Sequence, residues 1–128
     1  MTVHVSKNGD RLLPGAELEG KDLSNQNLRE VKLQRANLRG ANIAASDLTK
    51  AVLEGSNLTD ADLSGSGLES ASFEGADLKR ANLSGALLTD TMFRGASLER
   101  AVLRGAKNSL YLERTNLEDA DLSCTEFA

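Results

Sequence analysis

The chain contains very few aromatic residues, cysteines or histidines. Its 128 residues include no tryptophan, one tyrosine and three phenylalanines, although 40% of the residues are hydrophobic. Any core must therefore be assembled mainly from leucine and alanine. The single cysteine, Cys124, cannot form an intrachain disulfide. The single histidine, His4, is far from Cys124 in sequence, so neither a metal cluster nor a Cys/His catalytic pair is indicated.

There is also no excess of basic residues and no long apolar run. Nineteen acidic against fifteen basic residues give a net charge of -4, whereas a protein that binds nucleic acid directly is expected to be basic. No stretch approaches the roughly 20 apolar residues of a membrane-spanning helix, and the N-terminal segment lacks a signal-peptide pattern. Composition therefore predicts a cytoplasmic protein that binds neither nucleic acid nor a membrane.

What the sequence does contain is a five-residue repeat. A large apolar residue recurs every five positions from Leu18 to Leu103. Asn or Asp repeatedly precedes it, and the residue two positions before it is usually small. The unit reads A-(D/N)-L-x-x. A period of five fits neither a helix nor a flat strand. It suits a chain that turns a corner after each unit and points one large and one small side chain inward, so that about 20 residues close a square coil.

The glycines occupy a fixed place in this repeat. Nine of the eleven lie two positions after a central apolar residue, and only Gly9 and Gly67 fall elsewhere. If a four-residue turn begins at the central residue, this is its third position, where a type II turn needs positive φ and favours glycine. From Lys50 to Gly105 glycine alternates with other residues there. The sequence thus predicts that opposite corners share a turn type and that glycine corners alternate with non-glycine corners.

With these A-(D/N)-L-x-x units, the chain resembles the pentapeptide-repeat family. The resemblance implies an all-β fold, the right-handed quadrilateral β-helix, with coils stacked about 4.8 Å apart and about five to six coils in all. We expect residues 1–10 to form an irregular N-terminal cap or extension and residues 11–128 to form the β-helix.

The repeat breaks once, near residues 106–110. After Leu103 the next central position holds Asn108, and the pattern resumes one residue early at Leu112. A buried asparagine amide needs hydrogen-bond partners, so we expect a distorted corner here. The break is either a slip that the solenoid absorbs or a binding feature, because irregular segments on rigid scaffolds often carry function.

Residues twenty apart should lie on the same face, so outward columns can be predicted. One column runs through Lys32, Val52, Ser72, Met92 and, past the break, Tyr111. We expect the neighbouring faces to add the apolar side chains of Leu87 and Val102. The resulting candidate interaction surface comprises Val52, Leu87, Met92, Val102, Asn108 and Tyr111. Tyr111 is its best anchor. The alternative interpretation is ordinary scattered apolar exposure.

Charge is segregated along the sequence. No Lys or Arg lies between Lys50 and Lys79, and this stretch supplies a predicted acidic belt of Glu54, Asp60, Asp62, Glu69, Glu74 and Asp77. A basic stretch precedes it. The last apolar repeat residue is Phe127. Because solenoid ends expose apolar core and unpaired backbone unless they are covered, Phe127 is the candidate contact of an end-to-end homodimer.

No catalytic or nucleotide-binding motif occurs, and we predict no enzymatic activity, no cofactor and no metal. A rigid solenoid with variable outward positions favours a scaffold that binds another protein, whose identity the sequence does not indicate. The family resemblance implies an alternative, a DNA-mimicking inhibitor of the type II topoisomerase gyrase that confers quinolone tolerance. The basic stretch opposes the uniformly negative surface that such mimicry needs. A structural segment of a larger assembly is the further alternative.

Overall fold

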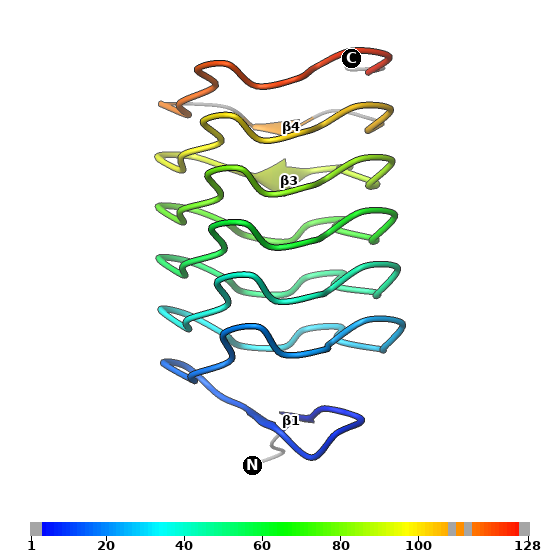
Figure 1. The fold of residues 1–128 in the computed structure, drawn as a ribbon, viewed down its shortest axis with the longest axis vertical. Helices are drawn as coiled ribbons and strands as arrows, with labels where there is room; N and C mark the ends of the chain where they lie inside the picture. Colours follow the sequence, from blue (N-terminus) through cyan, green and yellow to red (C-terminus); the bar gives the residue numbers. More distant parts are fainter. Residues whose placement is uncertain (1–3, 108–109, 112–113, 126–128) are drawn as a thin grey trace.

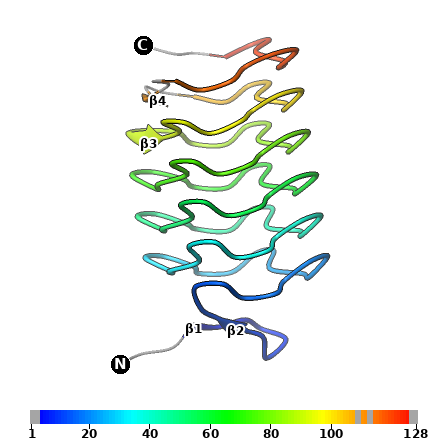
Figure 2. The same ribbon diagram turned by 90° about the vertical axis from the view of Figure 1, so that its left-hand side faces the viewer.

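The computed structural model describes residues 4–107, 110–111 and 114–125 of the chain. These residues wind into a β-helix of stacked coils (Figures 1 and 2). The two-residue strands are β1 (His4–Val5), β2 (Arg11–Leu12), β3 (Thr91–Met92) and β4 (Leu110–Tyr111). Most of the ladder consists instead of isolated parallel bridges, because the chain turns a corner before a longer strand can form.

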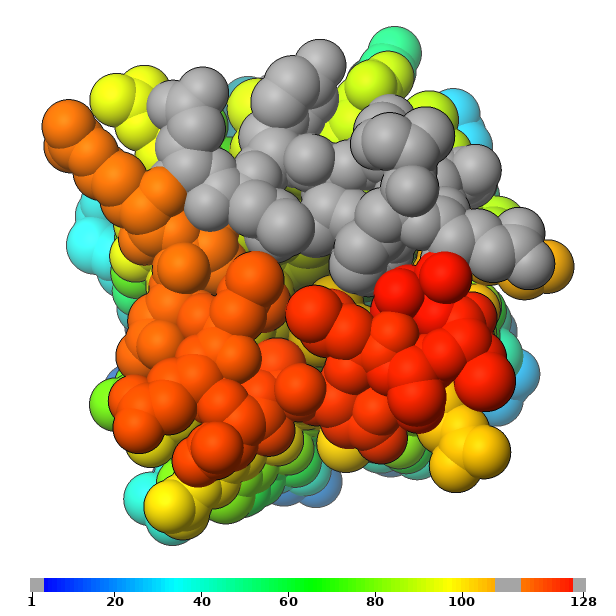
Figure 3. All heavy atoms as spheres, turned by 90° about the horizontal axis from the view of Figure 1, so that it is seen from above, coloured from blue at the N-terminus to red at the C-terminus, as the bar shows by residue number. Residues whose placement is uncertain are grey.

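Parallel bridges join residues twenty positions apart and define four faces. Each bridge residue except Lys107 lies immediately before a central apolar residue, and the four columns begin at Glu17, Asp22, Asn27 and Lys32. We name each face after the first residue of its column. The faces follow one another in this order around the coil, so the Lys32 face adjoins the Asn27 and Glu17 faces and lies opposite the Asp22 face. Seen from above, the coils stack within a four-sided outline (Figure 3).

Backbone hydrogen bonds between coils accompany each unit. The Leu38 N–H donates to the Asn57 carbonyl at 2.7 Å, and the Asn57 N–H donates back to the Ala36 carbonyl at 3.0 Å. At the corner, the Gly40 N–H donates to the Thr59 carbonyl at 2.9 Å. The coils thereby satisfy one another's backbone groups without long strands.

The core is the column of central residues with its small partners. Every central residue from Leu38 to Leu103 is 0% exposed, and each such side chain contributes about 1.5 to 3 kcal/mol before ordering costs. Phe73 and Phe93 stack one coil apart, with ring centroids 5.2 Å apart and planes inclined by 12°. Where serine replaces alanine, its hydroxyl is satisfied by backbone: Ser66 Oγ donates to the Ile43 carbonyl at 2.8 Å.

The corners contradict the predicted alternation of turn types. The third turn residue has positive φ whether or not it is glycine, as in Ala45 (56°), Lys50 (61°) and Gly65 (66°). The reason is the stacking. The Ala45 N–H donates to the Ser64 carbonyl and the Gly65 N–H to the Ser84 carbonyl, both at 2.9 Å. The described corners present their N–H groups along the solenoid axis to the next coil, so they share one turn type, and non-glycine residues accept the strain.

The N-terminal residues form a hairpin beneath the coils. Strand β1 pairs antiparallel with β2, with His4 opposite Leu12 and Val5 opposite Arg11, and Leu12 is only 3% exposed. Arg11 and Leu12, which the repeat assigned to the β-helix, thus belong to this hairpin. The inter-coil ladder begins with the hydrogen bond from the Gly15 N–H to the Gln34 carbonyl at 2.8 Å.

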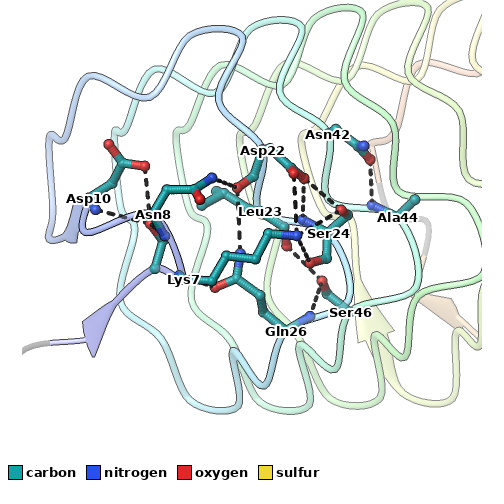
Figure 4. Close-up of polar contacts among 11 residues, drawn as sticks. Lys7, Asn8, Asp10, Asp22, Leu23, Ser24, Gln26, Asn42, Ala44 and Ser46 are labelled. Carbon is teal, nitrogen blue, oxygen red and sulfur yellow. Dashed lines mark hydrogen bonds and ion pairs between the residues drawn. The ribbon is translucent and has the colours of Figure 1, made fainter.

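Polar contacts hold the hairpin to the coil above it (Figure 4). The Lys7 ammonium lies 2.9 Å from the Ser24 carbonyl and 3.3 Å from the Asp22 carboxylate. Asp22 Oδ1 also accepts hydrogen bonds from the Ser24 hydroxyl at 2.5 Å and from the Ser24 N–H at 3.0 Å. These bonds and the Lys7 charge lower the pKa of Asp22 from 3.8 to about 2.

The one-residue shortening of the repeat appears as a change of register. Leu87 pairs with Lys107, twenty positions on, whereas Met92 pairs with Tyr111, nineteen positions on. Val102 and Asp121 keep the shorter offset. The missing residue is therefore absorbed between Lys107 and Leu110, and parallel pairing continues above it.

Candidate interaction surface

The Lys32 face carries the predicted apolar column. Bridges join Lys32 to Val52, Val52 to Ser72 and Ser72 to Met92, and β3 pairs Met92 with Tyr111. Val52 and Met92 are half-buried. Ser72, between them, is only 5% exposed, and its hydroxyl donates to Glu54 Oε1 at 3.2 Å. The centre of this face is therefore two apolar side chains separated by a covered serine.

Leu87 lies on the adjacent Asn27 face and is 40% exposed. The corner residues Thr89 and Asp90 separate it from Met92 along the chain. Its lower neighbour in the column is Gly67, which has no side chain. Leu87 therefore extends the apolar surface around one corner of the solenoid.

Val102 does not belong to this surface, and that part of the prediction is wrong. Its bridges to Asn82 and Asp121 place it on the Asp22 face. That face is half a coil away from Met92, on the opposite side of the solenoid. The twenty-residue period already contained this information, because 102 and 92 differ by half a coil of four equal sides.

Two further predicted contact residues, Asn108 and Phe127, lie outside the described residues, and their roles stay predictions. Tyr111 is placed by its backbone pairing with Met92. The exposed apolar residues that the sequence did not single out lie near the two ends: Val5 is 57% exposed in the hairpin and Leu122 is 38% exposed in the uppermost described coil.

The acidic belt encircles the solenoid instead of forming one face. Glu54 and Glu74 stack at one corner, while Asp62 and Asp77 lie on different faces. Its charge is also partly paired by residues above it in the stack. Arg80 Nε donates to Asp60 Oδ1 at 2.8 Å and thereby lowers the pKa of that carboxyl group.

At the levels of Val52 and Met92, four exposed charged residues border the Lys32 face at its two corners. Lys50 and Asp90 each precede the face by two residues, at the levels of Val52 and Met92 respectively. Glu54 and Arg94 each follow it by two residues at the same two levels. At each corner, then, the charge changes sign between the lower and the upper level.

The described residues give no sign of a metal centre or a membrane span. Among them, no three His, Cys, Asp or Glu side chains gather in a way that could hold a metal ion. Within the same part of the chain, no helix has the length and apolar character needed to cross a bilayer. The free Cys124 is exposed at a corner.

Solved structures share this fold. The chain aligns with a trypsin-treated variant of QnrB1, a plasmid-mediated fluoroquinolone resistance protein, at a TM-score of 0.78 and 22% identity, covering 84% of this chain and 56% of that one. A pentapeptide-repeat protein of the Arabidopsis thaliana thylakoid lumen aligns at 0.58 and 30% identity over 72% of this chain and 61% of that one. This chain thus spans less than two thirds of either protein. The pentapeptide-repeat protein alr5209 of Nostoc aligns at 0.61 and 31% identity, covering 84% of this chain and 85% of that one.

No curated protein sequence matches the chain. The family of pentapeptide repeats does match, with eight copies over residues 13–43, 36–75, 46–85 and 66–105. Together with the solved neighbours this confirms the predicted fold class, a right-handed β-helix. The chain belongs to the pentapeptide-repeat family.

Proposed function

We propose that this protein is a non-enzymatic, rigid solenoid that binds another protein through the Lys32 face and the adjoining Leu87. One observation carries the proposal: Val52 and Met92 stand on a single face, half-buried, between exposed charged corners. Apolar side chains within a polar rim are the usual composition of a protein interface. The inter-coil ladder fixes their spacing, so little ordering is needed on binding.

The experiment is affinity capture with the full chain and with matched surface variants. Met92→Asp is expected to abolish capture of a partner that the wild-type chain retains, because it places a charge at the centre of the surface. Val102→Asp is the control, since it makes the same kind of change at a half-buried bridge position on the opposite face. Equal capture by all three proteins would contradict the proposal.

A second candidate is DNA mimicry directed at gyrase, and the acidic belt around the solenoid favours it. A protein surface that replaces DNA must be negative along its length. Here Asp60 is paired with Arg80 at 2.8 Å and Asp77 lies 3.8 Å from Lys79, which reduces the field. Gyrase supercoiling with added protein tests this candidate, and unchanged supercoiling at high protein concentration would remove it.

A further inference from the structure

We propose that the partner of the Lys32 face is a second copy of this chain, bound side by side in antiparallel orientation. This inference rests on the proposed function and names its partner. It starts from the symmetry of the column, in which Ser72 is the middle residue, with Val52 one coil below and Met92 one coil above. A two-fold axis that lies in the interface at Ser72, perpendicular to the solenoid, would therefore set Met92 of each copy against Val52 of the other.

The charged corners obey the same symmetry. This rotation reverses the direction of the solenoid axis, and it brings each corner of one copy against the same corner of the other copy. Lys50, at the level of Val52, then faces Asp90 of the second copy, at the level of Met92. On the other side Glu54 likewise faces Arg94 of the second copy. Each contact occurs twice, so the two copies meet with opposite charges around the apolar centre, as electrostatically matched interfaces do.

The parallel arrangement would also set unlike charges together at the corners, with Lys50 facing Glu54 and Asp90 facing Arg94 of the second copy, and it differs in the contacts within the face. A two-fold axis along the solenoid would set Val52 on Val52 and Met92 on Met92, and it would also bring the exposed Lys32 of one copy against Lys32 of the other. In the antiparallel arrangement Lys32 faces the level of Tyr111 instead. In the antiparallel arrangement only the level of Ser72 meets the same level of the second copy. At that level Glu74 faces Glu74 of the second copy across the two-fold axis.

The total exposed surface sets an upper limit on the area of such an interface. The solvent-accessible surface of the chain is 6299 Å². One of the four faces with its two corners makes up at most about a quarter of it, roughly 1,600 Å². A standard protein interface buries ~800 Å² on each partner. The apolar centre is small, because Val52 and Met92 are already half-buried. We therefore expect a reversible dimer with a micromolar or weaker dissociation constant, whose formation depends strongly on the charged pairs.

Charge reversal tests both the contact and its direction. Sedimentation velocity on the full chain over a range of concentrations is expected to show a monomer–dimer equilibrium. Lys50→Asp should weaken the dimer about 10-fold, because it faces Asp90, and the double variant Lys50→Asp/Asp90→Lys should restore it. Glu74→Gln should tighten the dimer several-fold by removing the like charges on the axis. In a parallel dimer Lys50 and Asp90 do not meet, and the double variant would be weaker than the single one.

Disulfide trapping gives an independent readout. In a Cys124→Ser background, a mixture of the Val52→Cys and Met92→Cys proteins should cross-link to each other on mild oxidation, and each protein alone should cross-link little. Efficient self-cross-linking of either one would overturn the antiparallel arrangement. Thermal unfolding of each variant controls for folding. A chain that stays monomeric at every concentration, while Met92→Asp still abolishes capture of another protein, would refute this inference and leave the proposed function standing.

Discussion

Ala45 and Gly65 allow a sharp test of the corner conformation. They occupy the same corner one coil apart, with φ of 56° and 66°, and make the same inter-coil hydrogen bond at 2.9 Å. A left-handed conformation costs an L-residue about 1 to 2 kcal/mol. Glycine avoids that cost, but it lowers the free energy of unfolding by about 0.4 to 1 kcal/mol because it raises the conformational entropy of the unfolded chain. Ala45→Gly should therefore stabilise the protein by about 0.5 to 1 kcal/mol.

Gly65→Ala should do the opposite. A Cβ built at Gly65 meets nothing within 4 Å, so no steric clash adds to the backbone term and the expected loss is about 1 kcal/mol. Urea unfolding followed by circular dichroism measures both changes as shifts in the midpoint at unchanged slope. Ala44→Gly is the control, because Ala44 is not among the left-handed residues and its replacement should destabilise by about 0.5 to 1 kcal/mol. If Ala45→Gly destabilised the protein as Ala44→Gly does, the left-handed turn at non-glycine corners would be refuted.

Three further outcomes can be measured by the same unfolding experiment. Phe93→Ala should cost about 3 to 5 kcal/mol, because it opens a cavity against the stacked Phe73; Val5→Ala, at an exposed site, should have little effect. Ser66→Ala should cost about 1 to 2 kcal/mol, since its buried hydroxyl donates to a backbone carbonyl, and a neutral result would show that the carbonyl finds another donor. Asp22 has a folded-state pKa of about 2, below its ordinary 3.8, so its contribution is complete above about pH 4 and is lost as the pH falls to about 2. Asp22→Asn should lower stability at pH 7 and flatten this acid dependence, and an unchanged profile would contradict the Lys7–Asp22–Ser24 network.

Much of the fold could be predicted because the repeat is local and periodic. The inward residues, such as Leu38 and Ala41, follow from the spacing alone, and so do the four faces and the column through Val52 and Met92. The one-residue shortening before Leu112 was also evident in the sequence. A strict five-residue period places the large side chains at equivalent inward positions, so the spacing was sufficient to predict which residues are buried.

The tertiary structure decided what depends on contact between coils. Ala45 and Lys50 adopt the glycine-like conformation because the corner N–H must reach the next coil, a requirement that no single unit contains. Asp60 is paired by Arg80 from the coil above, so a stretch that looks purely acidic along the chain is partly neutralised in space. The N-terminal hairpin and its Lys7–Asp22 contact likewise join segments that share no repeat. The sequence by itself determined which residues face inward, because that follows from the five-residue period within each coil. The turn conformation, the charge pairing and the cap follow from hydrogen bonds and ion pairs between coils, which only stacking brings into reach.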